Sequence, residues 1–473
     1  MARSSRFEMD MTTGKLLPKV LMFSLPLIAS GILQLLFNAA DMAVVGTFAH
    51  QNRDAAQAAI GSTNSLINLM VNVFMGLSVG GSVCVARAYG AGDQEQVHKG
   101  VHTSITLAVI SGLAVAIIGV LFCEPLLQLM GNPETALATR YMRIYFLGMP
   151  FNMLYNFGAA ILRAVGDTKR PLTYLLIAGV VNVVLNLVMV CLVGLDVEGV
   201  AIATVASQVI SAILVITCLI RSDSSIRLNL RSLRIHREQM RRILQVGLPA
   251  GLQGSLFSIS NVLIQSSVNS FSTIPTAGNS IAGSLEGFVY TSMNSVHQAA
   301  LTFASQNLGA GQIRRVRRSV WVCVGTVTVI GLVLGNLMFL FGEPLLRLYL
   351  KDPAAVDPLT GVSVLSYGML RMKYMLPLYC LCGLMDVAVG SLRGVGYSVM
   401  PMIVSLTGAC LFRVVWILLI FNPTPVAMRT PDLLYISYPL SWAVTFGVHL
   451  LCYAFVARPK LLALEKRIGE NAA

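Results

Sequence analysis

The sequence predicts an all-α polytopic membrane protein with twelve transmembrane helices in two six-helix bundles, related by a pseudo-two-fold axis along the membrane normal. Three observations predict this fold: an apolar composition, twelve apolar segments and an internal repeat. Of the 473 residues, 55% are hydrophobic and only 12% are charged, whereas about a quarter of a typical soluble domain is charged. A soluble globule could not cover its surface with so few polar groups. The chain is therefore expected to lie in a bilayer.

The individual elements follow from apolar stretches bounded by Gly, Pro, Asn, Asp or charged residues. A spanning helix takes about 20 residues, so twelve helices use about half of the chain and leave short loops. The first stretch is too long for a signal peptide and lacks a small-residue cleavage site, so we expect it to remain as a helix. The predicted helices lie near residues 20–46, 58–85, 101–122, 141–162, 171–194, 198–220, 243–271, 278–305, 319–341, 374–392, 400–421 and 433–457.

Lysine and arginine are unevenly distributed over the ends of these helices. If both termini are cytoplasmic, 25 of the 34 basic residues lie on the inner side and eight on the outer side, which agrees with the bias of basic residues toward the cytoplasm. The most basic inner segment lies midway along the chain. We therefore expect an N-terminal bundle at 1–220, a basic cytoplasmic linker at 221–242 and a C-terminal bundle with a cytoplasmic tail at 243–473, all in the cell membrane.

The two halves of the chain repeat four short motifs in the same order. Each half holds six helices, an even number, so the second half enters the bilayer from the same side as the first. Two such bundles form the architecture of a rocking transporter with its pathway between them. The repeated pairs are Ser24-Leu25-Pro26 and Gly247-Leu248-Pro249, Gly90-Ala91-Gly92 and Gly309-Ala310-Gly311, Glu124-Pro125-Leu126-Leu127 and Glu343-Pro344-Leu345-Leu346, and Leu162-Arg163-Ala164-Val165-Gly166 and Leu392-Arg393-Gly394-Val395-Gly396.

These motifs resemble those of the prokaryotic multidrug and toxic compound extrusion (MATE) transporters. The resemblance covers essentially the whole chain and is carried by Leu25-Pro26 with Asp41, by residues 87–93, by residues 162–171, by residues 306–311 and by residues 392–396. It implies a twelve-helix secondary antiporter. Such an antiporter exports bulky, often cationic, drugs or toxic metabolites by alternating access, in exchange for Na⁺ or H⁺.

Three acids lie inside predicted helices: Asp41, Glu286 and Asp386. A charge at the centre of a spanning helix costs about 3 kcal/mol on insertion scales, so such residues are normally functional or paired. Asp41 lies five residues before Gly46, at the predicted outer end of its helix. Asn182, Asn186 and Thr204 lie at similar depths on the fifth and sixth predicted helices. We expect these four side chains to converge in the outer half of the first bundle.

A carboxylate with amide and hydroxyl oxygens suits a hard monovalent cation, and a buried carboxylate can equally take up a proton. The family resemblance implies the same four positions, Asp41, Asn182, Asn186 and Thr204, as a cation site of the first bundle. Asn186 stands where one branch of the family has a second aspartate, and this difference leaves the choice between Na⁺ and H⁺ open. The alternatives are a structural hydrogen-bonded acid at Asp41 and interhelical hydrogen bonds at the other three.

The second bundle is expected to contribute Glu286, Asp386 and Arg413, which could contact substrate or carry protons. Arg413 could be the counter-ion of either acid, and a static ion pair is the alternative. His297 lies three helical turns from Glu286 and could relay protons, although an ordinary hydrogen-bonded histidine is the simpler interpretation.

The remaining expectations concern partners and competing functions. We expect no cofactor, no metal site and no nucleic-acid partner, and we expect a monomer that contacts membrane lipid and small organic substrates. Arginines at 314–318 are expected to face anionic lipid. No hydrolase, metalloprotease or Walker motif is present in the sequence, which argues against an enzyme. A lipid-linked oligosaccharide flippase of the same superfamily is the alternative, and it would need a cleft rich in arginine and lysine.

Overall fold

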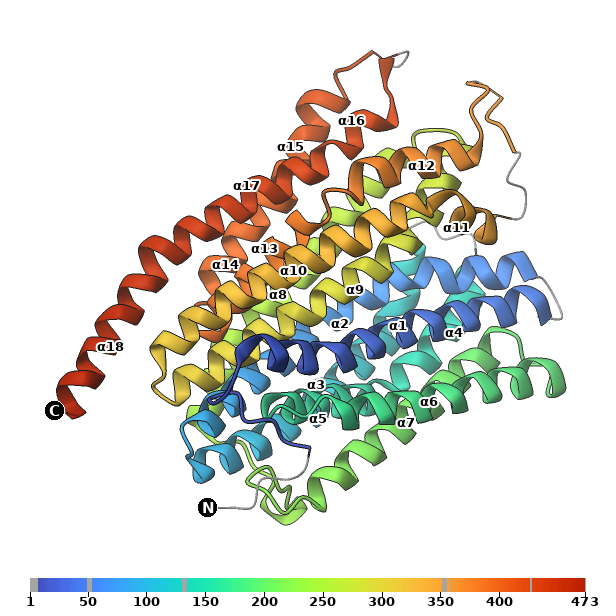
Figure 1. Ribbon diagram of the computed structural model, residues 1–473. Coiled ribbons are helices and arrows are strands. Elements are labelled where there is room, and N and C mark those ends of the chain that lie inside the picture. Colours follow the sequence, from blue (N-terminus) through green and yellow to red (C-terminus); the bar gives the residue numbers. More distant parts are fainter. Residues whose placement is uncertain are drawn as a thin grey trace. The chain divides into compact units, whose positions relative to one another are not determined.

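The computed structural model describes residues 7–48, 53–129, 134–350, 355–358, 360–425 and 428–472 (Figure 1). Within these residues the chain is helical and contains no strand, apart from one isolated antiparallel bridge between Val356 and Ser363. Arg3, Arg6 and Lys351, which count toward the predicted topology, lie outside the described residues. Each of the twelve predicted segments falls on one helix or on consecutive helices.

The first half of the chain supplies seven α-helices. They are α1 (Leu16–Phe48), α2 (Arg53–Gly90), α3 (Gln94–Leu129), α4 (Thr135–Leu147), α5 (Met149–Ala164), α6 (Lys169–Leu187) and α7 (Val197–Ile220), and a π-helical turn, η1 (Val188–Leu192), directly follows α6.

The second half begins with a 3₁₀ turn, η2 (Leu230–Ser232), in the predicted linker. Its helices are α8 (Arg237–Val268), α9 (Thr273–Gly309), α10 (Ile313–Leu340), α11 (Gly342–Tyr349), α12 (Val364–Met375), α13 (Cys380–Gly394), α14 (Val399–Ser405), α15 (Phe412–Trp416), α16 (Pro431–Tyr435), α17 (Ser437–Cys452) and α18 (Arg458–Ala472). Three π-helical turns interrupt or extend them, namely η3 (Leu406–Leu411), η4 (Ile417–Phe421) and η6 (Tyr453–Ala457).

Two predicted helices are broken where proline removes a backbone donor. The segment 141–162 forms α4 and α5 with a break at Gly148, and Pro150 lies in the first turn of α5. The segment 374–392 straddles α12 and α13, which meet at a 49° bend around Pro377. Proline has no N–H to continue the helical ladder, so both breaks have the same physical cause.

By length and apolar composition, eight of the described helices could cross a membrane, and nine could if the bent pair α12–α13 counts as one span. The chain is therefore a multi-pass membrane protein. Helices α8 and α9 fall outside that group because their sequences are rich in Ser, Asn and Gln, and α8 also begins with several charged residues. Polar side chains in a spanning helix are tolerated where they face protein instead of lipid.

The chain divides into two compact units. Unit 1 comprises residues 1–13, 25–255 and 305–310, and unit 2 comprises residues 14–24, 256–304 and 311–473. The first half of α8 belongs to unit 1 because glycines spaced four apart let it touch α2. A Cβ atom on Gly76 of α2 would lie 2.1 Å from the backbone nitrogen of Gly251, and one on Gly80 would lie 2.2 Å from the carbonyl oxygen of Ile243.

Within unit 1, α3 packs against α2, α4 and α5, and α7 packs against α4, α5 and α6. The predicted linker is fixed to the start of α3. His102, which is buried, hydrogen-bonds the main chain of Asn229, and the backbone N–H of His236 donates to Thr103 Oγ1 at 3.1 Å.

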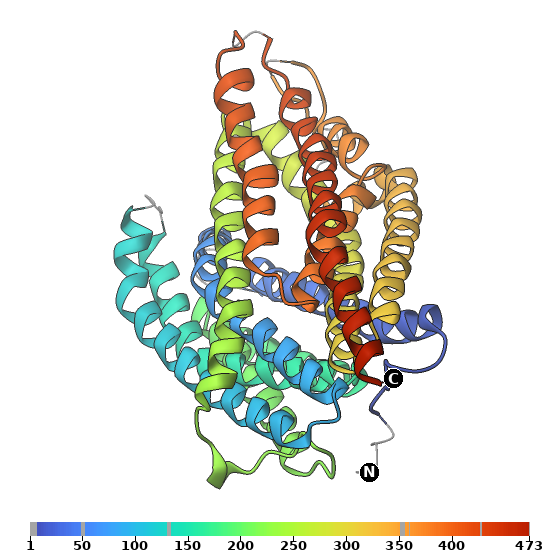
Figure 2. The ribbon, with the colours of Figure 1, turned by 90° about the vertical axis from the view of Figure 1, so that its left-hand side faces the viewer.

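Within unit 2, α13 packs against α10 and α17. Helices α17, η6 and α18 follow one another without a break, and α10 contacts α18 at the end where α10 begins (Figure 2). Val320 of α10 and Tyr453 and Ala457 of η6 share a small apolar core with Leu392 of α13.

Candidate cation and substrate sites

A close approach of α1 and α6 in unit 1 positions the first group of polar side chains. Gly179 of α6 has no side chain, so the ring of Phe37 of α1 lies directly against the helix, where a Cβ atom would be 1.8 Å from the ring. Asp41 follows Phe37 by one helical turn, and Asn182 and Asn186 follow Gly179 by one and two turns. The glycine contact therefore places the acid beside the two amides.

The four predicted side chains form one hydrogen-bonded chain. Asn186 Nδ2 donates to Asp41 Oδ1 at 2.5 Å and contacts Asn182 Oδ1 at 3.3 Å. Asn182 Nδ2 donates to Thr204 Oγ1 of α7 at 3.5 Å. The structure thus brings Asp41, Asn182, Asn186 and Thr204 together from three helices. Their role in binding a cation stays a prediction.

Two features of this group suit a bound cation or proton. Among the described residues, no lysine or arginine forms an ion pair with Asp41, whose one side-chain hydrogen bond there comes from a neutral amide. Asn186 is fully buried, and its Oδ1 atom has no hydrogen-bond donor in the described part of the chain. A carboxylate oxygen and an unpartnered amide oxygen are ligands that a hard cation such as Na⁺ accepts, and the carboxylate can alternatively hold a proton.

Two aromatic residues that were not predicted lie near this group of polar side chains. Tyr141 and Tyr145 of α4 stack with their ring centroids 6.0 Å apart, both lie within electrostatic range of Asp41, and Tyr145 hydrogen-bonds Gln208 of α7. Two tyrosines four residues apart share one helix face. That spacing in the sequence could have predicted an aromatic surface on α4.

In unit 2 the predicted acid Glu286 of α9 has a counter-ion that was not expected. Arg371 of α12 donates from Nε to Oε1 at 2.8 Å and from Nη2 to Oε2 at 2.7 Å, and its Nη1 donates to Asn279 Oδ1 at 2.6 Å. Both partners of the ion pair are largely buried. The predicted topology had placed Arg371 at an outer helix end, whereas the structure places its side chain inside the bundle.

The second predicted acid, Asp386 of α13, lies in a separate network. Its carboxyl group hydrogen-bonds Tyr290 of α9 and is attracted by Arg393, which lies on the same helix. His297 Nδ1 hydrogen-bonds the main-chain oxygen of Asp386 at 2.6 Å. His297 is therefore hydrogen-bonded to backbone, and among the described residues it forms no hydrogen bond with Glu286, which agrees with the simpler interpretation of this histidine.

Arg413 of α15 differs from the expectation of a counter-ion. Its Nε donates to Ser441 Oγ at 2.9 Å, and its guanidinium lies 4.1 Å from the Tyr438 ring centroid and 5.7 Å from the Trp442 ring centroid. Among the described residues no carboxylate forms an ion pair with it. Unit 2 therefore holds three largely buried arginines, at 371, 393 and 413, beside the predicted acids Glu286 and Asp386. The roles of Glu286, Asp386 and Arg413 toward substrate or protons stay predictions.

Comparison with known proteins agrees with this architecture. A family model described as MatE matches residues 26–188 and 249–419, one match in each half of the chain. The "Probable multidrug resistance protein YoeA" of Bacillus subtilis is 27% identical over 451 residues, which are 93% of this chain and 94% of the relative. An "FAD transporter" of Shewanella oneidensis is 25% identical over 316 residues, which are 66% of this chain and 70% of the relative.

Solved structures show the same fold. One, described as the outward-facing conformation of a multidrug resistance MATE family transporter of the MOP superfamily, matches with a TM-score of 0.84 and 21% identity over 98% of this chain and 100% of the other. The twelve-helix, two-bundle architecture predicted from the sequence is thereby confirmed. Fold and family together define a polytopic membrane transporter. The chain belongs to the MatE family of multidrug and toxic compound extrusion transporters.

Proposed function

We propose that the protein is a secondary active antiporter of the cell membrane that exports lipophilic organic cations in exchange for Na⁺ or H⁺. The observation that carries this proposal is Asp41, an acid in an apolar helix. Its side-chain hydrogen-bond partner in the described part of the chain is the neutral Asn186, whose own amide oxygen has no partner there. An ion can drive transport only if it binds the two orientations of the transporter with different affinity. A carboxylate that lacks a fixed counter-ion can supply that difference.

The substrate charge is argued from the same acid. A cation would be attracted by Asp41 and would stack on aromatic faces such as Tyr141 and Tyr145. The acids of unit 2 support this less, because Arg371 compensates Glu286 and Arg393 attracts Asp386. We therefore expect unit 1 to contribute most to cation selectivity, with both termini and residues 221–242 on the cytoplasmic side.

Arg413 supports a second candidate, the export of organic anions with an aromatic group. A buried guanidinium with aromatic neighbours and no ion-paired carboxylate among the described residues is a recognition group for a carboxylate or phosphate. The relative from Shewanella oneidensis is named for FAD, which is such an anion.

Transport by the purified chain in proteoliposomes tests the proposal. Sodium and proton gradients should be imposed separately, and the movement of ethidium and of FAD should each be followed by fluorescence. Gradient-driven ethidium transport that Asp41→Asn abolishes and Asp223→Asn preserves supports the cation antiporter. Asp223 is an exposed acid in the predicted linker and is the matched control. Driven transport of FAD without ethidium transport would support the second candidate and refute the first.

A further inference from the structure

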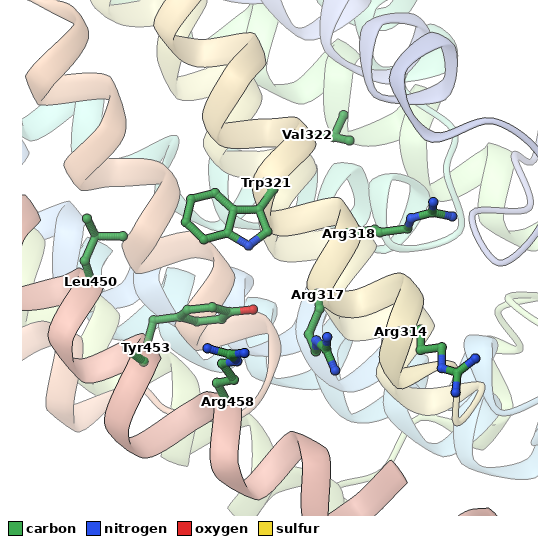
Figure 3. A pocket seen from close by; sticks show the side chains of 9 residues that line it. Arg314, Arg317, Arg318, Trp321, Val322, Leu450, Tyr453 and Arg458 are labelled. Atoms are coloured by element: carbon green, nitrogen blue, oxygen red, sulfur yellow. The ribbon is translucent and has the colours of Figure 1, made fainter.

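A groove of about 1050 Å³ lies in unit 2 between the start of α10 and the segment α17–η6–α18 (Figure 3). It belongs to neither of the polar groups described above. The side chains that line it are Arg314, Arg317, Arg318, Trp321, Val322, Leu450, Tyr453, Ala454 and Arg458.

Helical spacing explains why these residues share one groove. The α10 residues follow one another at positions i, i+3, i+4, i+7 and i+8, and those of the opposite segment at i, i+3, i+4 and i+8, so each set occupies one helix face. Both faces change from basic to apolar in the same direction. Arg314 and Arg458 lie toward the helix ends, and Trp321 and Leu450 lie further along (Figure 3). The groove therefore has a basic mouth and an apolar continuation.

The basic mouth carries excess positive charge. Arg314 and Arg317 share one carboxylate, that of Glu465 of α18, at 2.6 and 3.4 Å. Among the described residues no acid forms an ion pair with Arg318 or Arg458. The first turn of α10 also contains no acidic residue, although a helix start attracts negative charge and repels arginine. One carboxylate among four arginines leaves this end of the groove able to accept an anion.

Tyr453 provides a second, independent observation. Its side chain is only 8% exposed, and its hydroxyl group has no hydrogen-bond partner in the described part of the chain. Figure 3 shows the hydroxyl pointing across the groove toward α10 and Arg317. A buried hydroxyl without a partner costs free energy, so a ligand that accepts its hydrogen bond is favoured there.

We propose that this groove binds one anionic phospholipid of the cytoplasmic leaflet. Its phosphate lies between Arg317 and Arg458 and accepts the hydrogen bond of Tyr453, and an acyl chain lies against Trp321 and Leu450. The basic end is the end that the distribution of lysine and arginine predicts to be cytoplasmic, where anionic headgroups attract such clusters. The apolar continuation favours a lipid over a free phosphate. This is one lipid at a built site, more specific than the general attraction expected for residues 314–318.

Lipid binding to the 473-residue chain in detergent tests the proposal. Phosphatidylglycerol, phosphatidylcholine and glycerol 3-phosphate are titrated separately, and the bound states are counted by native mass spectrometry. Wild-type protein should bind phosphatidylglycerol about tenfold or more tightly than the other two probes. The double variant Arg317→Gln/Arg458→Gln should lose about tenfold in phosphatidylglycerol affinity or more, because two charge-assisted hydrogen bonds are removed. Tyr453→Phe should lose about threefold without any change in charge.

The matched control is Lys466→Gln/Arg467→Gln, which removes the same number of positive charges, both from α18, the helix that begins with Arg458. Arg467 lies nine residues after Arg458 and so on the opposite face of α18. Equal loss in the control would overturn the proposal in favour of diffuse attraction, and equal binding of glycerol 3-phosphate would reduce the site to a phosphate site. If the arginine variants unfold at lower temperature than the wild-type protein in the same detergent, Trp321→Ala tests the proposal in their place. Trp321→Ala should weaken the binding of phosphatidylglycerol and leave the binding of glycerol 3-phosphate unchanged. Unchanged binding of phosphatidylglycerol would refute the acyl contact.

Discussion

Arg371 of α12 donates hydrogen bonds to both carboxylate oxygens of Glu286 of α9, with donor–acceptor distances of 2.8 and 2.7 Å. Both residues lie in unit 2. The two residues are 85 positions apart in the sequence, and Tyr435 and Tyr438 lie about the guanidinium with ring centroids 5.9 Å away. A charge of this kind is compensated within the bundle and is not available to a substrate unless the pair opens. The pair is therefore first a structural element of unit 2.

Removing one partner of this pair should destabilise the protein more than removing both. Arg371→Gln leaves a buried carboxylate without its cation, and such a break costs about 3–5 kcal/mol. The double variant Arg371→Gln/Glu286→Gln removes both charges and should recover much of that loss. Thermal melting in one detergent measures both. A single variant that is as stable as the double variant would show that the pair is solvated.

Asp41→Asn should abolish gradient-driven export and leave folding and substrate binding in place. The amide can still hydrogen-bond Asn186, but it cannot carry a proton or supply charge to a cation. Transport in proteoliposomes, together with a binding titration of ethidium, separates the two effects. Full ion-coupled transport by this variant would place the coupling site elsewhere, at Glu286 or Asp386.

Asn186→Asp should distinguish Na⁺ coupling from H⁺ coupling. If Na⁺ is the driving ion, a second carboxylate beside Asp41 should tighten the site and lower the sodium concentration for half-maximal transport. If H⁺ is the driving ion, two adjacent carboxylates should share a proton and shift the pH optimum upward. Transport rates over a range of sodium concentration and pH decide between these results. Loss of activity in every condition would contradict both.

Gly179→Ala should disturb the site from a distance. The added methyl group would meet the Phe37 ring at 1.8–2.4 Å, so α1 and α6 must separate, at a cost of about 1–3 kcal/mol. Because Asp41 and Asn186 lie one and two turns beyond this contact, ion dependence should weaken as well. Adding Phe37→Leu to the Gly179→Ala variant should restore part of the lost stability and ion dependence. Gly325→Ala is the control, since nothing lies within 4 Å of its position.

Acidification should loosen the predicted linker. Partial burial and the nearby cations Arg234 and Lys99 lower the pKa of His236, which lies outside the spans. Its Nε2 atom accepts from Arg234 Nε at 3.0 Å, so the neutral ring is the bound form. A base with a lowered folded pKa contributes stability above about pH 6.5, and the contribution is lost as the pH falls. Hydrogen exchange at residues 229–236 should rise at about pH 5.5, and His236→Asn should remove this pH dependence.

The helices could be predicted because apolar length and repeated motifs are local properties of the sequence. The breaks at Gly148 and near Pro377 were missed because both lie inside predicted spanning segments, and the mean hydropathy of a segment does not register the backbone donor that proline lacks. The position of Arg371 was missed for a related reason. It stands near Lys373 at the edge of an apolar segment, and hydropathy assigns such charges to a loop.

The first polar group was predictable because depth in a membrane follows from the distance to a helix end. Asp41, Asn186 and Thr204 come from three helices that cross the same layer, so similar depth led to contact. Ion pairing in unit 2 depends instead on how helices rotate about their axes. No rule of sequence spacing relates Glu286 to Arg371. Arg413 was the more prominent candidate for the counter-ion because it lies at the centre of its predicted helix.

The π-helical turn η1 begins two residues after Asn186, and η4 lies almost in register with it in the second half. With the offset of 230 that relates Leu162 to Leu392, residues 188–192 correspond to 418–422, and Asn182 and Asn186 correspond to Phe412 and Trp416. Wide turns of this kind are weak points of a helix and occur often at functional positions. Duplication has thus kept a wide turn in both copies, beside the Asp41–Asn186 pair in the first half and beside Arg413 in the second. If Asp41 binds the coupling ion, as we propose, the ion would therefore act next to the wide turn of the first half, and the second half would have a wide turn at the corresponding place without an acid beside it.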